Sequence, residues 1–361
     1  MLWFVVVLLM LVVAISLFCL RGDNLSAHDS PRPAHNSGDS GPSEEHHAVV
    51  ASMGELSGMM GGGGSRSEQL QKMRDYLDDM GRDVSFEGRI TPLDTDQFKG
   101  EWVVADNADP DVRMLYIHGG AWIMGSPLSH RAITTHYANL IGGAVLSLDY
   151  RLMPENTRQQ GIDDCREAWR WLLDNGPQGH GSAKELYVSG DSAGGNLTLS
   201  LTAWIRDQGL RQPNAAVALS PATDGTFASP SMRDNVATDH MLGPQFGKLL
   251  RVPSWLLLWV GWFNNRIRPN QPSVSPVFDS LNDLPPTLVH ASEAEMLLDD
   301  AVRYANKARA AGSPVELQTW KDMVHVWHIF VADMPEAQHA FTEIDAFLKK
   351  HSGRQVGEVG A

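Results

Sequence analysis

Cysteine is scarce in this chain, and an excess of positive charge is absent. The 361 residues include only Cys19 and Cys165, too few for a disulfide framework. Cys19 lies in an apolar N-terminal segment and Cys165 in a helical pattern that suits a small buried residue, so neither is a candidate nucleophile. The formal net charge is −14, without a basic block. This balance argues against nucleic acid as a partner and does not favour adsorption to anionic lipid.

The sequence also offers no pattern for a phosphate-binding loop or a metal site. The glycines from Gly61 to Gly64 are not followed by the Gly-Lys-Ser/Thr ending that such a loop requires. His46 and His47 are adjacent, but they lie in a polar stretch where paired histidines are usually only solvated. We therefore expect neither a metal nor a cofactor.

The longest apolar run is at the N-terminus. Residues Leu2 to Leu20 are apolar apart from Ser16, which approaches the ~20 residues that span a bilayer as a helix. A signal peptide normally begins with basic residues, whereas Met1 is followed directly by apolar ones. Residues 1–20 are therefore predicted to be an uncleaved single-pass anchor in a membrane of the secretory pathway or endoplasmic reticulum. If the segment is instead a cleaved signal, the protein would be secreted.

A polar stretch separates this segment from the rest of the chain. From Gly22 to Gly64 the sequence is rich in Ser, Gly, Pro, His and acidic residues. Such a composition cannot bury enough apolar surface to fold alone, so residues 21–64 are predicted to be a disordered linker. Residues 65–361 are long enough for one large α/β domain.

The most informative stretch is Gly190-Asp191-Ser192-Ala193-Gly194-Gly195, which lies between two apolar runs. A strand, a sharp turn and a helix in this order form the G-x-S-x-G nucleophile elbow. The turn lifts the hydroxyl of Ser192 clear of the sheet, and Gly190 and Gly194 permit the close approach of strand and helix. The helix that follows directs its first N–H groups towards an oxyanion formed at Ser192.

The remaining apolar runs alternate between strand and helix patterns. This alternation predicts a mostly parallel central sheet with helices on both faces. The predicted strands cover residues 84–90, 102–105, 112–117, 144–148, 186–189, 215–219, 287–291 and 315–320.

One insert, at about residues 222–276, interrupts the alternation. It has no strand pattern and carries Trp255, Trp259 and Trp262 among leucines. Because both faces of the sheet are already covered, we expect the insert to form a helical cap over the C-terminal ends of the strands, where such sheets bind ligands.

A serine hydroxyl needs a base that takes its proton and an acid that orients the base. In elbow hydrolases these partners follow the serine in the order acid, then histidine, each in a loop after a later strand. By this order His325 is the base, and His328 is the alternative inside an apolar helical start. The acid lies in the loop after residues 287–291, where the candidates are Glu293, Glu295 and Asp299.

A second set of N–H donors is expected upstream. The predicted strand at residues 112–117 runs directly into His118-Gly119-Gly120-Ala121. Small residues at a strand end let backbone N–H groups turn towards a reacting carbonyl oxygen. We therefore expect the N–H groups of Gly119, Gly120 and Ala121, together with that of Ala193, to form an oxyanion hole.

Five motifs recur here in a distinctive order and spacing. They are His118-Gly119-Gly120-Ala121-Trp122, Asp149-Tyr150-Arg151-Leu152 with Pro154-Glu155, Gly190-Asp191-Ser192-Ala193-Gly194-Gly195-Asn196-Leu197, Leu284-Pro285-Pro286-Thr287 and Val324-His325. In this arrangement the chain resembles the hormone-sensitive lipase family of α/β hydrolases. With its N-terminal segment it looks like the arylacetamide deacetylase-type esterases of that family. The resemblance covers roughly Ser65 to Lys350.

The resemblance implies an α/β-hydrolase fold and identifies further roles, with two departures from the family pattern. Ala121 replaces the third glycine of the oxyanion loop, which is tolerable if its φ is negative. The family's acid stands in an Asp-Pro-Leu-x-Asp pattern, and aligning Asp299 with the second aspartate places Glu295 at the catalytic acid. The family's substrates are short to medium acyl esters or arylacetamides, and its enzymes need no metal or cofactor.

We therefore expect a serine carboxylic-ester hydrolase that forms an acyl-enzyme from Ser192, with His325 and Glu295 as its partners. Its ligand is a small-molecule ester, contacted by Trp122 and, from the insert, by Trp255 and Trp259. Three alternatives remain open. The enzyme could be an arylacetamide-type deacetylase that uses the same residues, or a lipase that works at a lipid surface. A non-catalytic ligand-binding protein on this fold is the third, and the presence of His325 argues against it.

Overall fold

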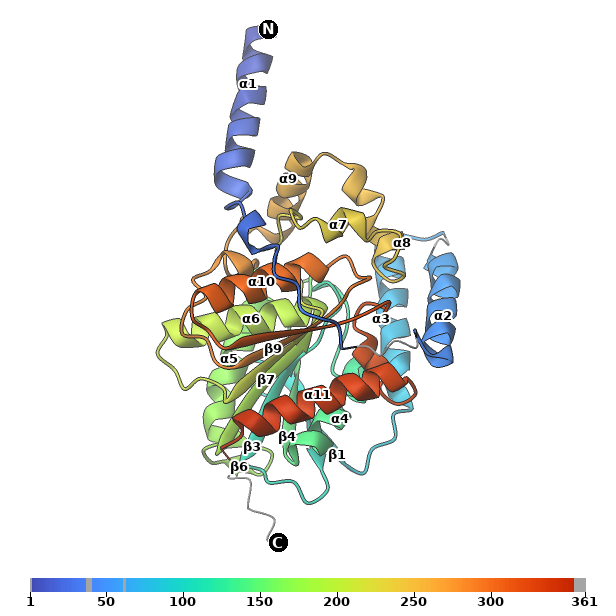
Figure 1. Cartoon of the computed structure of the whole chain (residues 1–361). Coiled ribbons are helices and arrows are strands. Elements are labelled where there is room, and N and C mark those ends of the chain that lie inside the picture. Colours follow the sequence, from blue (N-terminus) through green and yellow to red (C-terminus); the bar gives the residue numbers. More distant parts are fainter. Residues whose placement is uncertain (1, 37–40, 61–62, 354–361) are drawn as a thin grey trace.

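A computed structural model describes residues 2–36, 41–60 and 63–353 of the chain. Its centre is an eight-stranded sheet with the order β1-β2-β4-β3-β7-β8-β9-β10 (Figure 1). Strands β1 and β2 are antiparallel to each other, β2 is antiparallel to β4, and all other neighbours are parallel. The strands are β1 (Gly88–Asp94), β2 (Lys99–Ala105), β3 (Val112–Ile117), β4 (Ala144–Asp149), β7 (Glu185–Asp191), β8 (Ala215–Leu219), β9 (Thr287–Ser292) and β10 (Val315–Trp320). A separate hairpin pairs β5 (Asn175–Gly176) with β6 (Gly179–His180).

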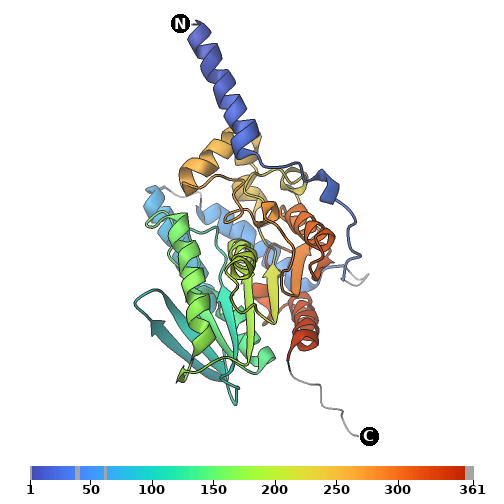
Figure 2. The ribbon, with the colours of Figure 1, turned by 90° about the vertical axis from the view of Figure 1, so that its left-hand side faces the viewer.

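Helices cover both faces of the sheet, as Figures 1 and 2 show. Helices α4 (Arg131–Ile141) and α11 (Pro335–His351) bury Tyr137 and Phe341 against one face. Helices α5 (Arg158–Asp174), α6 (Ser192–Asp207) and α10 (Leu298–Ala310) pack on the other. Every residue of the central strands β3, β7, β8 and β9 is buried, as expected for parallel strands that helices cover on both faces. The predicted α/β-hydrolase architecture is confirmed.

One further helix, α3, precedes the first strand of the sheet. Helix α3 (Arg66–Arg82) starts at a capping box, in which the Ser65 hydroxyl accepts from the backbone N–H of Glu68 and the Glu68 carboxylate accepts from that of Ser65.

The insert at residues 222–276 contains helices and turns. Its elements are α7 (Ser231–Asp234), α8 (Gly243–Phe246), the 3-10 turn Leu249–Arg251 and α9 (Ser254–Asn265). Met232, Leu250 and Leu257 of the insert pack with Met296 and Leu297, which follow β9. The insert therefore rests on the loop that leaves the C-terminal end of β9.

The N-terminal apolar run is divided into two parts. Helix α1 (Leu2–Ile15) has 14 residues, and the π-helical turn η1 (Ser16–Leu20) follows it. At 1.5 Å per residue α1 is about 21 Å long, shorter than the ~30 Å hydrocarbon core of a bilayer. Among the described residues, no helix is both long and apolar enough to cross a membrane. The structure thus does not support the predicted single-pass anchor.

The segment predicted to be a disordered linker differs most from expectation. Residues 21–36 lie along α10, where Asp29 pairs with Arg303 at 2.6 Å and Asn306 donates to the carbonyl oxygens of His28 and Pro31. Helix α2 (Glu44–Met60) follows, and residues 37–40 and 61–62 lie outside the described part. Composition indicates too little apolar burial for folding, but this segment is held by polar partners far away in the sequence.

Candidate active site

The elbow forms at the junction of β7 and α6. Strand β7 ends at Asp191, α6 starts at Ser192, and Ser192 has a φ of 51°. A Cβ on Gly190 would lie 2.5 Å from the carbonyl oxygen of Ile117, and a Cβ on Gly194 would lie 1.9 Å from it. Both distances are too short for any side chain, so these glycines are required by the approach of the elbow to β3. Ser192 is thereby held in a left-handed conformation that is strained for serine.

The structure brings Ser192, His325 and Glu295 together. His325 Nε2 lies 2.8 Å from Ser192 Oγ, and His325 Nδ1 lies 2.6 Å from Glu295 Oε2. The other carboxylate oxygen of Glu295 accepts from the backbone N–H of Ser292 at 2.8 Å, and Glu295 is fully buried. With Nδ1–H donated to Glu295, Nε2 is left to accept the serine proton. The three residues have the geometry of a nucleophile, a base and an orienting acid.

Two opposing effects act on the imidazole of His325. Burial, the largest single effect, disfavours the charged ring and lowers the pKa of His325. The hydrogen bond to Glu295 and the negative charge of that carboxylate act in the opposite direction, and the net pKa of His325 is raised above 6.5. The pair therefore favours an imidazole that takes up a proton readily.

The alternative residues are placed elsewhere. His328 is buried with His290, whose Nδ1 lies 3.1 Å from His328 Nε2, and burial holds the pKa of His328 well below its usual value. Glu293 accepts from the Thr319 hydroxyl, and Asp299 is paired with Arg32. In the part of the chain that the structure describes, no group of three or more His, Cys, Asp or Glu side chains is arranged to hold a metal ion.

The loop after β3 differs from the predicted oxyanion hole in one donor. The N–H of Gly119 is donated to Asp191 Oδ1 at 3.0 Å, so it is already used inside the protein. Gly120 has a φ of 109° and Ala121 a φ of 53°. The negative φ that would make Ala121 tolerable is therefore not observed, and the backbone is strained there. The predicted donors that remain are Gly120, Ala121 and Ala193. Ala193 lies in the first turn of α6, where the N–H groups have no intrahelical acceptor.

Asp191 connects the two loops, a role that the motif alone does not reveal. Its Oδ1 accepts from the Tyr116 hydroxyl at 2.6 Å as well as from Gly119, and Oδ2 lies 3.4 Å from His130 Nε2. Burial alone would raise the pKa of Asp191, but His130 and the hydroxyl of Tyr116 lower it overall. A buried carboxylate thus fixes the ends of β3 and β7 relative to each other.

The three predicted substrate-contacting tryptophans have different surroundings. Trp122 donates from Nε1 to the carbonyl oxygen of Ala193 at 3.2 Å, which places its ring at the start of α6. Trp255 is exposed, and Trp259 donates from Nε1 to the Ser16 hydroxyl at 2.8 Å. Of the three, Trp122 is the one that the structure places next to the elbow.

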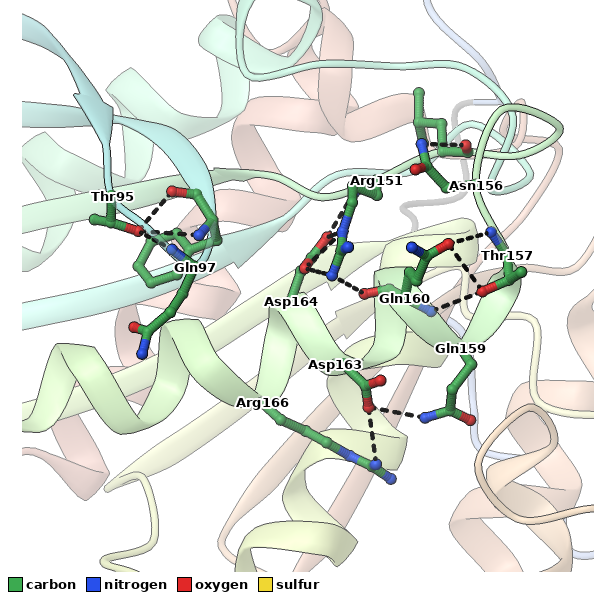
Figure 3. A network of polar contacts seen from close by, with 12 residues as sticks. Thr95, Gln97, Arg151, Asn156, Thr157, Gln159, Gln160, Asp163, Asp164 and Arg166 are labelled. Atoms are coloured by element: carbon green, nitrogen blue, oxygen red, sulfur yellow. Dashed lines mark hydrogen bonds and ion pairs between the residues drawn. The ribbon is translucent and has the colours of Figure 1, made fainter.

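A polar network at the end of β4 supports the same region (Figure 3). Arg151 donates to Asp164 from its backbone N–H at 2.8 Å and from its guanidinium at 2.6 Å, which fixes the loop after β4 to α5. In that loop the N–H of Met153 donates to the carbonyl oxygen of Trp122 at 2.9 Å. The loop that begins at Asp149-Tyr150-Arg151 is therefore fixed to α5 and also hydrogen-bonded to the loop after β3.

Comparisons with known proteins point to the same kind of fold. A family model described as alpha/beta hydrolase fold matches residues 114–329. An acetyl-hydrolase of Streptomyces hygroscopicus is 34% identical over 254 residues, which are 70% of this chain and 80% of that protein. An esterase of Acinetobacter venetianus is 33% identical over 262 residues, 72% of this chain and 81% of the relative. The crystal structure of an esterase from the bacterial hormone-sensitive lipase family has 30% identity and a TM-score of 0.73, covering 86% of this chain and 99% of its own.

Proposed function

This chain belongs to the hormone-sensitive lipase family of the α/β-hydrolase fold, and from that we propose that it is a serine carboxylesterase acting through an acyl-enzyme. The observation that carries the proposal is the continuous contact from Glu295 through His325 to Ser192, at 2.6 and 2.8 Å. The esterases and acetyl-hydrolase among its relatives support the same reaction class.

In the first half-reaction, Ser192 Oγ attacks the ester carbonyl carbon while His325 Nε2 takes the hydroxyl proton. The carbonyl oxygen becomes an oxyanion that accepts hydrogen bonds from the N–H groups of Gly120, Ala121 and Ala193. Collapse of this intermediate breaks the bond to the alcohol oxygen, which leaves with the proton from His325. The acyl group remains on Ser192.

In the second half-reaction, water replaces the alcohol. His325 takes a proton from the water, whose oxygen attacks the acyl carbon and forms a second oxyanion in the same place. Collapse releases the carboxylic acid and returns the proton to Ser192. Glu295 holds the imidazole in the Nδ1–H tautomer and stabilises the imidazolium that forms in both steps.

We infer short to medium acyl esters as the substrates, as expected for this family. The insert at residues 222–276 acts as a cap, and its apolar side chains Met232, Leu250 and Leu257 pack beside the loop that carries Glu295. Trp122, next to the elbow, contributes an aromatic wall. Together with residues 65–221 and 277–361, the cap completes one catalytic domain.

Activity-based labelling followed by an ester panel tests the proposal. A fluorophosphonate probe should label the wild type and not Ser192→Ala, and Ser200→Ala on the same helix should label normally as the matched control. A panel of p-nitrophenyl esters should then give the highest kcat/KM for short to medium chains. Labelling of Ser192→Ala, or an unlabelled wild type that is folded, would disprove an activated Ser192. Preference for acetanilides would indicate a deacetylase, and activity that rises only above the substrate's solubility limit would indicate a lipase.

A further inference from the structure

The structure exposes an unusual amount of apolar surface on two helices. Every residue of α1 is apolar, so this helix has no polar face that could meet water. The exposed fractions of Trp3 and Phe4 are 81% and 75%. On α9, in the insert, the exposed apolar side chains are Trp255, Leu256, Val260 and Phe263. Apolar patches of this kind on a folded protein mark interaction sites.

These two helices form one surface. The turn η1 that ends the N-terminal run lies against α9, where Trp259 Nε1 donates to the Ser16 hydroxyl at 2.8 Å. Ser16 and Leu20 are buried in this contact region. Figures 1 and 2 both show α1 projecting from the side of the molecule on which α9 lies. We refer to α1, η1 and α9 together as the apolar platform.

The charge next to the apolar platform is opposite to that of the whole chain. Between His240 and Phe278 there is no Asp or Glu, although the chain carries a formal net charge of −14. Lys248 and Arg251 precede α9, Arg266 and Arg268 follow it, and all four are exposed. The overall acidity therefore conceals a local basic border around exposed apolar side chains.

We propose that the apolar platform docks on the surface of an anionic phospholipid bilayer. Helix α1, about 21 Å long, would enter one leaflet, which would leave the exposed side chains of α9 at the level of the headgroups. The four cations contact lipid phosphates, and the Trp side chains of α9 suit the interface because they are amphipathic. This docking is independent of the hydrolytic reaction at Ser192.

Vesicle flotation with the purified full chain tests the docking. The protein should float with vesicles of phosphatidylcholine and phosphatidylserine, more weakly with phosphatidylcholine alone, and high salt should reduce the difference. Arg266→Glu/Arg268→Glu should lower the partition coefficient on anionic vesicles at least tenfold, because each basic residue near an anionic surface contributes roughly fivefold to binding. Phe263→Ser should weaken binding to both kinds of vesicle.

The matched control is Arg89→Glu/Lys350→Glu, which makes the same charge change on β1 and α11. It should bind anionic vesicles nearly as well as the wild type, and all variants should hydrolyse dissolved esters normally, which confirms folding. Equal losses in the two double variants, or equal wild-type binding to neutral and anionic vesicles, would overturn the proposal. A dimer in ultracentrifugation without lipid that Phe263→Ser dissociates would overturn it too, and would assign the platform to a second copy of this chain.

Discussion

Glu295 and Asp300 lie on the same segment after β9, and both are buried carboxylates, yet they have different partners. Glu295 lies 2.6 Å from the imidazole of His325. Asp300 accepts from the N–H groups of Thr223 and Asp224 at the base of the insert, and it faces the carboxylate of Asp224. Burial and that second acid raise the pKa of Asp300 to about 7. The partner, and not burial, therefore decides whether such an acid faces the imidazole or holds the insert.

The largest expected effect is on kcat, which should distinguish Glu295 from Asp300. Glu295→Gln should lower kcat about 10⁴-fold, because loss of the orienting carboxylate disturbs the imidazole tautomer. Ser192→Ala and His325→Ala should each lower kcat further, by about 10⁶-fold, since the members of a catalytic triad act as a unit. Asp300→Asn should retain most of the activity. Steady-state kinetics on a dissolved short-chain ester measure all four variants, and a severe loss in Asp300→Asn with a mild one in Glu295→Gln would reverse the assignment.

The second prediction distinguishes the acids by the pH dependence of stability. The pKa of Asp300 is about 7 in the folded protein, against ~3.9 in an unfolded chain. Its contribution to stability is therefore fully present below the unfolded value and is lost as the pH rises through about 7. The Asp300→Asn variant keeps an oxygen that accepts from Thr223, and its side chain cannot ionise. Between pH 5 and pH 8 the melting temperature of this variant should therefore fall less than that of the wild type.

Thermal denaturation across that pH range measures the effect. Asp79→Asn, which changes an exposed carboxylate on α3, is the control and should reproduce the wild-type pH profile. A profile for Asp300→Asn parallel to that of the wild type would show that Asp300 is already ionised in the folded protein.

Asp299, also in the segment after β9, contacts the N-terminal part of the chain, and a variant of its partner Arg32 tests that contact. Asp299 is buried, and its carboxylate accepts from Arg32 at 2.5 Å and from the N–H of Ser231 at 2.8 Å. Arg32→Ala removes one donor from a buried charge and should lower the free energy of unfolding by about 1–3 kcal/mol. Arg82→Ala breaks an exposed pair with Asp79 and should change it by less than ~0.5 kcal/mol. Urea denaturation compares the two variants, and equal effects would mean that Arg32 contributes only a surface ion pair.

The smallest expected effect is a change in stability at Ala121, in the loop after β3. Ala121 has a φ of 53°, which costs an alanine about 1–2 kcal/mol, whereas glycine adopts it freely. Ala121→Gly should therefore stabilise the protein by up to ~1 kcal/mol after the larger entropy of the unfolded glycine is included. Ala310→Gly at the end of α10 should instead destabilise it by about 0.5–1 kcal/mol. Destabilisation by both changes would show that Ala121 is not strained.

Local patterns sufficed for the fold and for part of the site. The elbow at Ser192 and the position of His325 follow from motif and strand order, since each depends on residues adjacent in sequence. Among the candidate acids, sequence order alone left Glu295 undecided, and the structure places it beside His325. The use of the Gly119 N–H by Asp191 was not predictable, because it depends on a side-chain position set by Tyr116.

The N-terminal segment escaped prediction for a related reason. The ion pairs of Asp29 with Arg303 and of Arg32 with Asp299 join parts of the chain that are distant in sequence. No local periodicity accompanies them, and a Ser- and Pro-rich composition argues for disorder. The same contacts explain why the segment folds in spite of that composition.

The path of the N-terminal segment also affects the outer borders of the sheet. Strand β10 is the last in the order, and beyond it His35 pairs in parallel with Thr319 while the N–H of Asn36 donates to the Thr319 carbonyl oxygen at 2.6 Å. The opposite border, β1, contains Pro92, which cannot donate to another strand. An open strand border can pair with another molecule and begin aggregation. By occupying part of the β10 border, residues near His35 help keep separate molecules from joining their sheets.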